Sequence, residues 1–377
     1  MDLLALAAAA FAIVATLIHV LSVLIAIWRF DRTRSTPPIE RLPPVTIIRP
    51  LCGVDAYEQQ TLSSIFRLDH PDYEVILCVA DPSDPVIPLA RATIAAHPNV
   101  PARLLIGDDR ISPNPKLNNV MKGWRAARHG WIVIVDSNVL TPPDYLGRLL
   151  ATWRADTGLV CAPPIGALPH GFAAEIECAF LNTYQARWQY TADTLGLGFA
   201  QGKTMLWRRD DLNAAGGLAA LAREVAEDAA ATKVVRAQCR RVRLVDRPFP
   251  QLLGPRTFAN VWHRQLRWAR LRRVSFPACH APEILTGLTL PLAAAISAAP
   301  TLDLPPLGVA AAMMIVWLGA EARLASAAGW HLTWRSPLAW LVRDLILPVL
   351  WCAALTGSRF EWRGSAMRAT ASANRSA

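Results

Sequence analysis

The chain has 377 residues, of which 53% are hydrophobic and only 18% are charged. Soluble domains carry about 25% charged residues, so the composition excludes a disordered or fibrous chain and indicates that part of the protein lies in lipid. The net charge of +10 suits an anionic membrane surface as well as a nucleic acid. Seven cysteines without a C-x-x-C pair are typical of a reducing compartment, not of a disulfide or zinc framework.

The first predicted element is an apolar run from Leu3 to Trp28. It exceeds the ~20 residues that span a bilayer and is too long for the apolar core of a signal peptide. Arginine accumulates on the cytoplasmic side of membranes, and four arginines follow the run: Arg29, Arg32, Arg34 and Arg41. We therefore expect residues 1–30 to form a transmembrane anchor that is followed by a cytosolic domain. A buried core helix is the alternative.

Residues 43–255 have the pattern of a soluble α/β domain. Short apolar runs rich in β-branched residues predict strands at 45–48, 74–79, 131–135 and 158–161. Helical patterns separate them at 55–67, 85–96 and 116–128. Strands that alternate with helices indicate a mostly parallel sheet with both faces covered. Ligands of such sheets lie beyond the carboxyl ends of the strands.

After residue 282 the sequence becomes apolar again. Residues 284–300 and 304–320 are two candidate membrane spans, joined by a loop without lysine or arginine. They predict a C-terminal membrane region at 283–358, and a basic tail at 359–377 follows it.

A third apolar stretch, 337–357, has unusual features for a span. It contains Arg343 and Asp344, and Pro348 is expected to break it. A charged pair at membrane depth is costly, and a third crossing would place the basic tail outside, against the positive-inside preference. We therefore expect 337–357 to be interfacial or re-entrant.

Acidic residues follow two of the predicted strands. Asp81 follows the strand at 74–79, and Asp136 follows the strand at 131–135. We expect these strands to be neighbours. A carboxylate at the end of so apolar a strand needs a partner, and a divalent cation that bridges to phosphate oxygens is a suitable one. A turn former or helix cap is the alternative for each acid.

Two further clusters lie later in the chain. Glu227-Asp228 begins a helical stretch, where acids either favour the helix N-terminus or present a general base to a substrate hydroxyl. The amphipathic segment 256–282 carries residues suited to bind a diphosphate and a ring, among them Arg264, Arg267 and Trp268. A basic helix on anionic lipid is the alternative. Nucleic acid is disfavoured because apolar stretches flank this cluster and no recognised binding motif is present.

In this order the motifs resemble the ceramide glucosyltransferase family, which is related to the GT-A class of inverting glycosyltransferases. The similarity runs from about Val45 to Arg273. Its fragments are Arg49-Pro-Leu-Cys-Gly-Val-Asp55, Leu68-Asp-His-Pro-Asp-Tyr-Glu-Val75, Asn114-Pro-Lys-Leu-Asn-Asn119, Ala215-Gly-Gly217, Ala226-Glu-Asp228 and the Arg-x-x-Arg-Trp of 264–268. The resemblance implies an α/β GT-A fold with a mostly parallel sheet, flanked by N-terminal and C-terminal transmembrane helices.

The resemblance also implies roles for individual residues. Asp81 corresponds to the aspartate that contacts the uridine, Asp136 to the one at the metal and diphosphate, and Asp228 to the catalytic base. The donor side further includes Lys116, Asn119, Arg264, Arg267 and Trp268, and the acceptor side Gln185, Gln201 and Trp268. Because Asp136-Ser-Asn138 is not a full D-x-D, Mg²⁺ or Mn²⁺ is expected on Asp136 and the Asn138 carbonyl.

The implied activity is inverting transfer of glucose from UDP-glucose to the primary hydroxyl of ceramide. Independently of the resemblance, the Ala- and Arg-rich composition and the short loops favour a multi-pass protein of a bacterial inner membrane, with the catalytic domain in the cytosol. Gln185-Ala186 and Gln201 stand where the animal enzymes carry His-Pro and Cys. A hopanoid or diacylglycerol acceptor, with UDP-N-acetylglucosamine or UDP-galactose as donor, therefore stays open. A polysaccharide synthase is disfavoured by the small number of C-terminal spans. A catalytically inactive lipid- or nucleotide-binding membrane protein is the remaining alternative.

Overall fold

The computed structural model describes residues 2–32, 42–362 and 365–368. Arg34, Arg41 and the end of the basic tail lie outside the described residues. The chain forms two compact units. The sheet unit consists of Thr33–Leu168, Ala192–Gly254 and Arg359–Ala377, and the helical unit consists of Met1–Arg32, Pro169–Thr191 and Pro255–Ser358.

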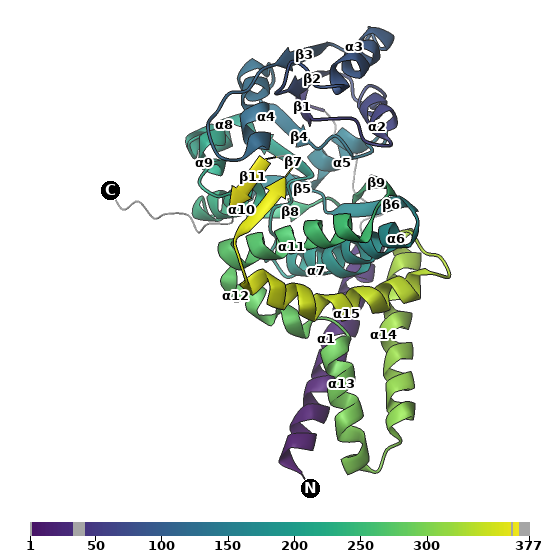
Figure 1. The fold of residues 1–377 in the computed structure, drawn as a ribbon. Coiled ribbons are helices and arrows are strands. Elements are labelled where there is room, and N and C mark those ends of the chain that lie inside the picture. Colours follow the sequence, from purple (N-terminus) through teal and green to yellow (C-terminus); the bar gives the residue numbers. More distant parts are fainter. Residues whose placement is uncertain (1, 33–41, 363–364, 369–377) are drawn as a thin grey trace. The chain divides into compact units, whose positions relative to one another are not determined.

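The sheet unit is built on seven strands in the order β3-β2-β1-β4-β7-β5-β8 (Figure 1). Their bounds are β1 Val45–Leu51, β2 Tyr73–Val79, β3 Ala102–Ile106, β4 Trp131–Val135, β5 Thr157–Cys161, β7 Thr204–Arg208 and β8 Arg241–Leu244. All neighbours are parallel except β7, which is antiparallel to both β4 and β5. The expected α/β fold with a mostly parallel sheet is confirmed.

Helices alternate with these strands along the chain. They are α2 Glu58–Ser64, α3 Val86–Ala96, α4 Pro115–Ala126, α5 Tyr145–Thr152, α8 Arg209–Ala214, α9 Leu218–Leu221 and α10 Glu227–Ala237. All seven residues of β2 are buried, as expected for a parallel strand that is covered on both faces. Two short two-stranded sheets pair β6 (Pro164–His170) with β9 (Phe249–Pro255) and β10 (Arg359–Trp362) with β11 (Ser365–Arg368).

The two strands that end before Asp81 and Asp136 are not neighbours, so this expectation is wrong. Strand β1 lies between β2 and β4. The chain first places β2 and β3 on one side of β1 and then crosses to β4 on the other side. This reversal creates a topological switch point between β1 and β4, where open α/β sheets bind their ligands. Asp136 follows β4 at that point.

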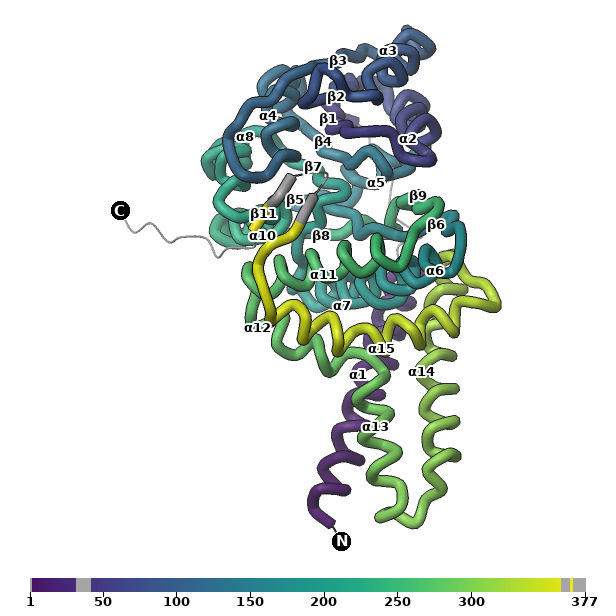
Figure 2. The backbone as a smooth tube through the Cα atoms, viewed as in Figure 1, coloured from purple at the N-terminus to yellow at the C-terminus, as the bar shows by residue number. Residues whose placement is uncertain are grey.

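The helical unit contains the apolar helices from both ends of the chain. Its elements are α1 Leu3–Arg32, α6 Phe172–Ala179, the π-helix η2 Phe180–Ala186, α7 Arg187–Thr194, α11 Phe258–Ser275, α12 Pro277–His280, η3 Ala281–Leu285, α13 Thr289–Ala298, η4 Ala299–Leu302, α14 Pro306–Ala328 and α15 Ser336–Leu355. Helices α1, α13 and α14 run alongside one another, whereas α15 runs across them (Figure 2).

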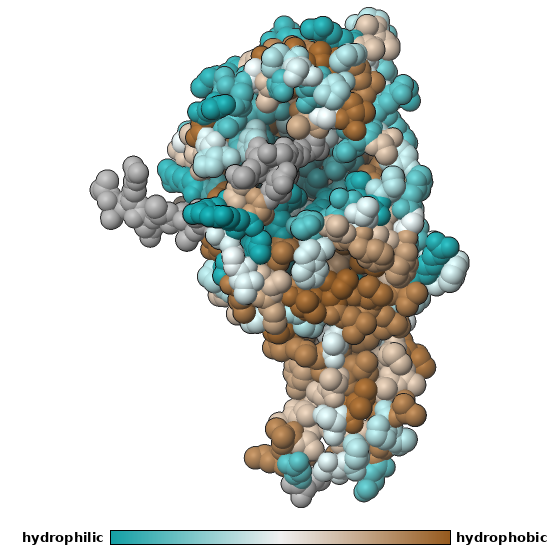
Figure 3. All heavy atoms as spheres, viewed as in Figure 1, coloured by the Kyte–Doolittle hydropathy of each residue, from teal (hydrophilic) through white to brown (hydrophobic). Residues whose placement is uncertain are grey.

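Within the described part of the chain, three helices are long and apolar enough to cross a membrane, namely α1, α14 and α15. A pair bent by 45°, Pro277–Leu285 with Thr289–Leu302, is a possible fourth span. Apolar side chains cover the outside of these helices (brown in Figure 3), and Leu21 and Leu307 are 55% and 87% exposed. So large an apolar surface marks a membrane contact. The expectation of apolar membrane helices at both ends is confirmed.

Pro348 does not break α15, contrary to the expectation from the sequence. A proline inside a helix leaves the carbonyl four residues earlier without its usual donor. That carbonyl belongs to Asp344, and it accepts a hydrogen bond of 2.6 Å from the Thr289 hydroxyl. The helix continues because α13 supplies the missing donor. The interfacial or re-entrant placement of α15 stays a prediction. The course of α15 across the other apolar helices agrees with it.

The charged pair in α15 is neutralised inside the helical unit. The Arg343 guanidinium lies 2.7 Å from Glu321 Oε1 of α14 and 2.9 Å from Asp344 Oδ1. All three side chains are buried, with at most 2% exposed. Since a buried charge needs a partner, Glu321 explains how an apolar stretch can carry Arg343 and Asp344.

Candidate functional site

Asp136 is held between two lysines at the end of β4. Lys116 Nζ lies 2.7 Å from Asp136 Oδ1, and Lys203 Nζ lies 2.8 Å from Oδ2. Burial alone would raise the pKa of Asp136, but the two ammonium groups outweigh burial and hold its pKa well below the usual range. Asp136 is therefore a charged carboxylate at every physiological pH.

Lys116, at the start of α4, connects Asp136 to the start of α10. Its Nζ lies 2.8 Å from Glu227 Oε1 and 2.5 Å from the carbonyl oxygen of Gly202. Asn114, the N-cap of α4, accepts from the Lys116 N–H and donates to Glu227 Oε2 over 2.8 Å. Gly202 has no room for a side chain, because a Cβ would lie 2.8 Å from Glu227 Oε1. The network therefore holds the Lys116 ammonium group and the Glu227 carboxyl group in place.

Asp228 follows Glu227 in the first turn of α10. Its Oδ1 accepts a hydrogen bond of 2.8 Å from the Ala229 N–H. Burial and then the neighbouring Glu227 raise the pKa of Asp228 to about 6, whereas Lys116 acts in the opposite direction. A carboxylate whose pKa lies close to working pH is suited to accept a proton from a substrate.

Asp81 lies exposed in the loop after β2. Its carboxylate accepts hydrogen bonds from the Ser83 hydroxyl over 2.7 Å and from the Ser83 N–H over 2.8 Å. These two bonds lower the pKa of Asp81. The side chain is thus ionised and within reach of a ligand, and its contact with a uridine stays a prediction.

Asn119 ties the ends of two strands together. Its amide donates to the carbonyl oxygens of Leu51 (3.3 Å) and Cys78 (2.9 Å), and its Oδ1 accepts from Lys122 Nζ over 2.5 Å. The side chain is buried. The side chain thus holds the ends of β1 and β2 together, and a direct contact between Asn119 and a donor stays a prediction.

Arg49 is a positioning residue whose role was not predicted from the sequence. Its side chain is fully buried in β1 and donates to the carbonyl oxygens of Thr61 (2.8 Å), Ser137 (2.5 Å) and Val139 (2.7 Å). It therefore fixes the loop that follows Asp136. An arginine inside an apolar strand was the available signal, because such a residue requires buried acceptors.

Asn138 shares a partner with Asp136. Its Oδ1 lies 3.2 Å from Lys203 Nζ, so two oxygen atoms converge on one point. Such oxygens are ligands that Mg²⁺ accepts together with phosphates and water. Among the residues that the structure describes, no group of three or more His, Cys, Asp or Glu side chains could hold a metal. The described residues thus supply two oxygen ligands, and water or phosphate oxygens would have to complete the coordination of a divalent cation.

The Arg-x-x-Arg-Trp motif lies in α11, in the helical unit. Thr257 and Asn260 form a capping box that starts this helix. Arg264 forms an ion pair with the buried Glu177 of α6, and its guanidinium lies 4.8 Å from the centre of the Trp268 ring. Part of the Arg264 charge is thus already compensated. The roles of Arg264, Arg267 and Trp268 towards a diphosphate stay predictions.

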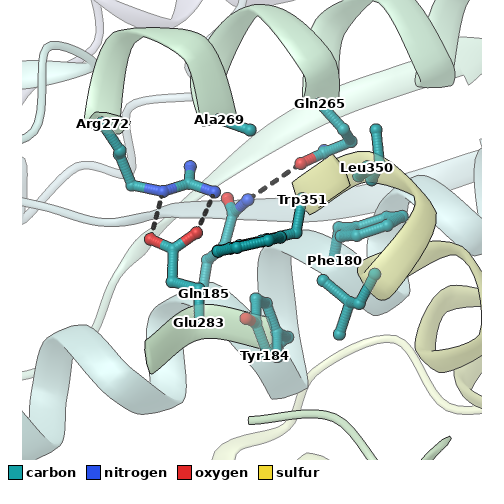
Figure 4. Close-up of a pocket in the computed structure, with 10 residues that line it drawn as sticks. Phe180, Tyr184, Gln185, Gln265, Ala269, Arg272, Glu283, Leu350 and Trp351 are labelled. Carbon is teal, nitrogen blue, oxygen red and sulfur yellow. Dashed lines mark hydrogen bonds and ion pairs between the residues drawn. The ribbon is translucent and has the colours of Figure 1, made fainter. Parts of the chain in front are cut away.

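Gln185 lines a pocket in the helical unit (Figure 4). Helices η2, α11 and α15 and the turn η3 contribute its walls. Gln185 Nε2 donates to Gln265 Oε1 over 3.0 Å, and Arg272 pairs with Glu283 at 2.6 Å. Gln265 is 3% exposed, and its Nε2 has no hydrogen-bond partner among the described residues. The unused buried donor is a group that a ligand atom or a water molecule in this pocket would satisfy.

Gln201, the second residue expected on the acceptor side, belongs to the sheet unit. It lies directly before Gly202 of the lysine network and is partly exposed. Lys203, two residues later, was not predicted from the sequence. A lysine that directly precedes an apolar strand is too common at a surface to have marked a site.

Comparisons with known proteins identify the family of this chain. The chain matches glycosyl transferase family 21 over residues 8–374. It is 28% identical to ceramide glucosyltransferase 1 of Caenorhabditis elegans over 278 residues (73% of this chain, 59% of the relative). It is 32% identical to a ceramide glucosyltransferase of Komagataella phaffii over 234 residues (54% and 46%). The matches thus span about half of these relatives. A solved mannosyltransferase of Pyrobaculum calidifontis is 18% identical with a TM-score of 0.48, over 92% of this chain and 96% of that one. Because the family match covers nearly the whole sequence, the chain belongs to glycosyl transferase family 21.

Proposed function

We propose that this protein transfers glucose from UDP-glucose to the primary hydroxyl of ceramide, with inversion at the sugar. The observation that carries the proposal is the network at the switch point, in which Asp136 and Lys116 are fixed as charges beside Asp228, whose pKa is about 6. Family membership and the two ceramide glucosyltransferase relatives support the choice of donor and acceptor.

The proposed chemistry is a single displacement. A lipid hydroxyl has a pKa far above 7, so it must lose its proton as it attacks the anomeric carbon. Asp228 takes this proton, and the bond between the anomeric carbon and the UDP oxygen breaks as the new bond forms. One base without a covalent nucleophile gives inversion. Lys116 holds Asp136 and Glu227 in place beside the donor, and Asp81 binds the uridine.

A divalent cation is part of the proposal. Asp136 and Asn138 would hold Mg²⁺ or Mn²⁺, which supplies positive charge to the leaving diphosphate when bound. For Arg264, Arg267 and Trp268 we propose the role that the family signature implies, which is binding of the donor diphosphate. We place the sheet unit in the bacterial cytosol because arginines follow α1.

The pocket of Figure 4 is proposed to receive the polar part of the acceptor. Its buried Gln265 Nε2 can donate to a lipid hydroxyl or amide. Gln265→Leu should raise the KM for the lipid about fivefold, the effect of one lost hydrogen bond of ~1 kcal/mol. The KM for UDP-glucose should stay unchanged. Steady-state kinetics in lipid nanodiscs measure both constants, with the exposed Gln59→Leu of α2 as the control. An equal rise in both constants would contradict this assignment.

The rate should depend on the pH through Asp228. Its carboxyl is protonated below its pKa of about 6 and cannot then accept a proton. We expect kcat/KM to be level above pH 7 and to fall about tenfold per pH unit below pH 6. An ordinary aspartate, with a pKa of about 3.9, would keep the rate level down to about pH 5. A pH–rate profile with a flat limb between pH 5 and 6 would contradict a raised pKa.

Transfer by the purified protein tests the function. A panel of radiolabelled UDP-sugars is incubated with the protein in membranes with or without ceramide, and with EDTA as a control. We expect a glucolipid that depends on ceramide and is lost with EDTA. Transfer to a hopanoid or diacylglycerol would keep the reaction class and overturn the acceptor. UDP binding without any transfer would favour the inactive binding protein.

A further inference from the structure

Lys203 occupies a special position at the candidate metal site. It directly precedes β7, and its carbonyl oxygen accepts a hydrogen bond of 3.0 Å from the Asp136 N–H. Its ammonium group returns to the same residue, at 2.8 Å from Asp136 Oδ2, and also lies 3.2 Å from Asn138 Oδ1. The backbone and the side chain of Lys203 thus both hold the loop after β4. The ammonium group sits on the two oxygens that would bind a divalent cation.

We propose that Lys203 is an exchangeable counter-ion of Asp136 and Asn138, which a divalent cation must displace. A lysine ammonium and a metal ion cannot share the same two oxygens, because like charges at such a distance repel. The inference rests on the proposed use of a UDP-sugar at this site. Once displaced, the ammonium group can pair with phosphate oxygens of the donor. Metal and nucleotide should therefore bind with positive cooperativity.

Lys203, and not Lys116, is the group that exchanges. Lys116 is held by three acceptors, Asp136, Glu227 and the carbonyl oxygen of Gly202, and its side chain is 8% exposed. The Lys203 side chain is twice as exposed, at 16%. After Lys203 leaves, Asp136 still keeps Lys116 on Oδ1, so the carboxylate remains paired while Oδ2 takes the metal.

Binding of Mn²⁺ measures the competition without any turnover. Free Mn²⁺ is titrated by electron paramagnetic resonance in the wild type, in Lys203→Met and in Lys203→Arg. We expect Lys203→Met to bind Mn²⁺ alone about tenfold more tightly than the wild type, because the resident charge is gone. Lys203→Arg keeps the charge and should not bind more tightly. Lys233→Met is the matched control, because Lys233 lies on α10 and pairs with Glu224 outside the candidate site.

UDP is then added to each titration. It should tighten Mn²⁺ binding in the wild type and do so by a smaller factor in Lys203→Met. Unchanged or weaker Mn²⁺ binding by Lys203→Met without UDP would overturn the counter-ion role. If Lys203→Met does not fold, Lys203→Gln gives the same comparison. Failure of the wild type to bind UDP in any condition would instead overturn the proposed donor. The two outcomes can be told apart, because the role of Lys203 is tested by the titrations without UDP.

Discussion

Replacing Asp228 with asparagine should lower kcat about 1,000-fold, since general bases contribute ~10²–10⁴ to a rate. Asparagine has nearly the same shape as aspartate but cannot accept the proton of the attacking hydroxyl. The affinity for UDP should change little, because Lys116 keeps its partners Asp136 and Glu227. Single-turnover transfer and UDP titration calorimetry, made on one preparation, separate the two effects.

The control for this experiment is an acid outside the network. Asp210 is exposed in the first turn of α8, and Asp210→Asn should leave kcat and UDP affinity unchanged. If Asp228→Asn kept more than a tenth of the wild-type rate, another group would have to be the base. If it lost UDP binding as well, Asp228 would be a binding residue and the proposed single displacement would lose its base.

Replacing Arg343 with methionine should give the largest loss of stability. The change leaves Glu321 and Asp344 without their shared cation at sites that are at most 2% exposed. Removal of one partner from a buried ion pair destabilises a protein by about 3–5 kcal/mol. We expect a lower midpoint of thermal unfolding in detergent, followed by tryptophan fluorescence. Adding Glu321→Gln should recover part of the loss, because one of the two unpaired charges is removed.

The matched control is Arg335→Met, at an exposed arginine directly before α15. Its midpoint should equal that of the wild type. An unfolding midpoint of Arg343→Met that matched this control would show that the buried ion pairs do not stabilise the helical unit.

The central parallel strands could be predicted from the sequence because they are continuous apolar runs. The runs at 45–48, 74–79, 131–135 and 158–161 lie in β1, β2, β4 and β5. Three strands of the seven-stranded sheet were missed for physical reasons. Strand β3 lies at the edge of the sheet and is only partly buried, and β8, at the other edge, contains Arg241 and Arg243. Strand β7 lies between β4 and β5 and is antiparallel to both. Its position in the sheet is defined only by pairing with strands that are distant in the sequence.

Part of the candidate site could also be predicted from the sequence. The order of the short motifs along the chain identified Asp81, Asp136 and Asp228, because each motif consists of residues that are close together in the sequence. The contacts of Lys203 with Asp136 and of Glu227 with Lys116 form only in the folded chain, because each joins residues that are far apart in the sequence. The neutralisation of Arg343 by Glu321 of α14 likewise depends on helix packing, since 22 residues separate them. Spacing in a sequence carries no signal for such contacts.

The configuration of the product tests the central claim most directly. Purified protein is given UDP-glucose, whose anomeric bond is α, together with ceramide in nanodiscs. The coupling constant of the anomeric proton of the glucolipid is then measured by NMR. A single displacement with Asp228 as the base predicts a β-linked product, formed about 1,000-fold more slowly by Asp228→Asn. An α-linked product, or a β-linked product formed equally well by Asp228→Asn, would contradict it.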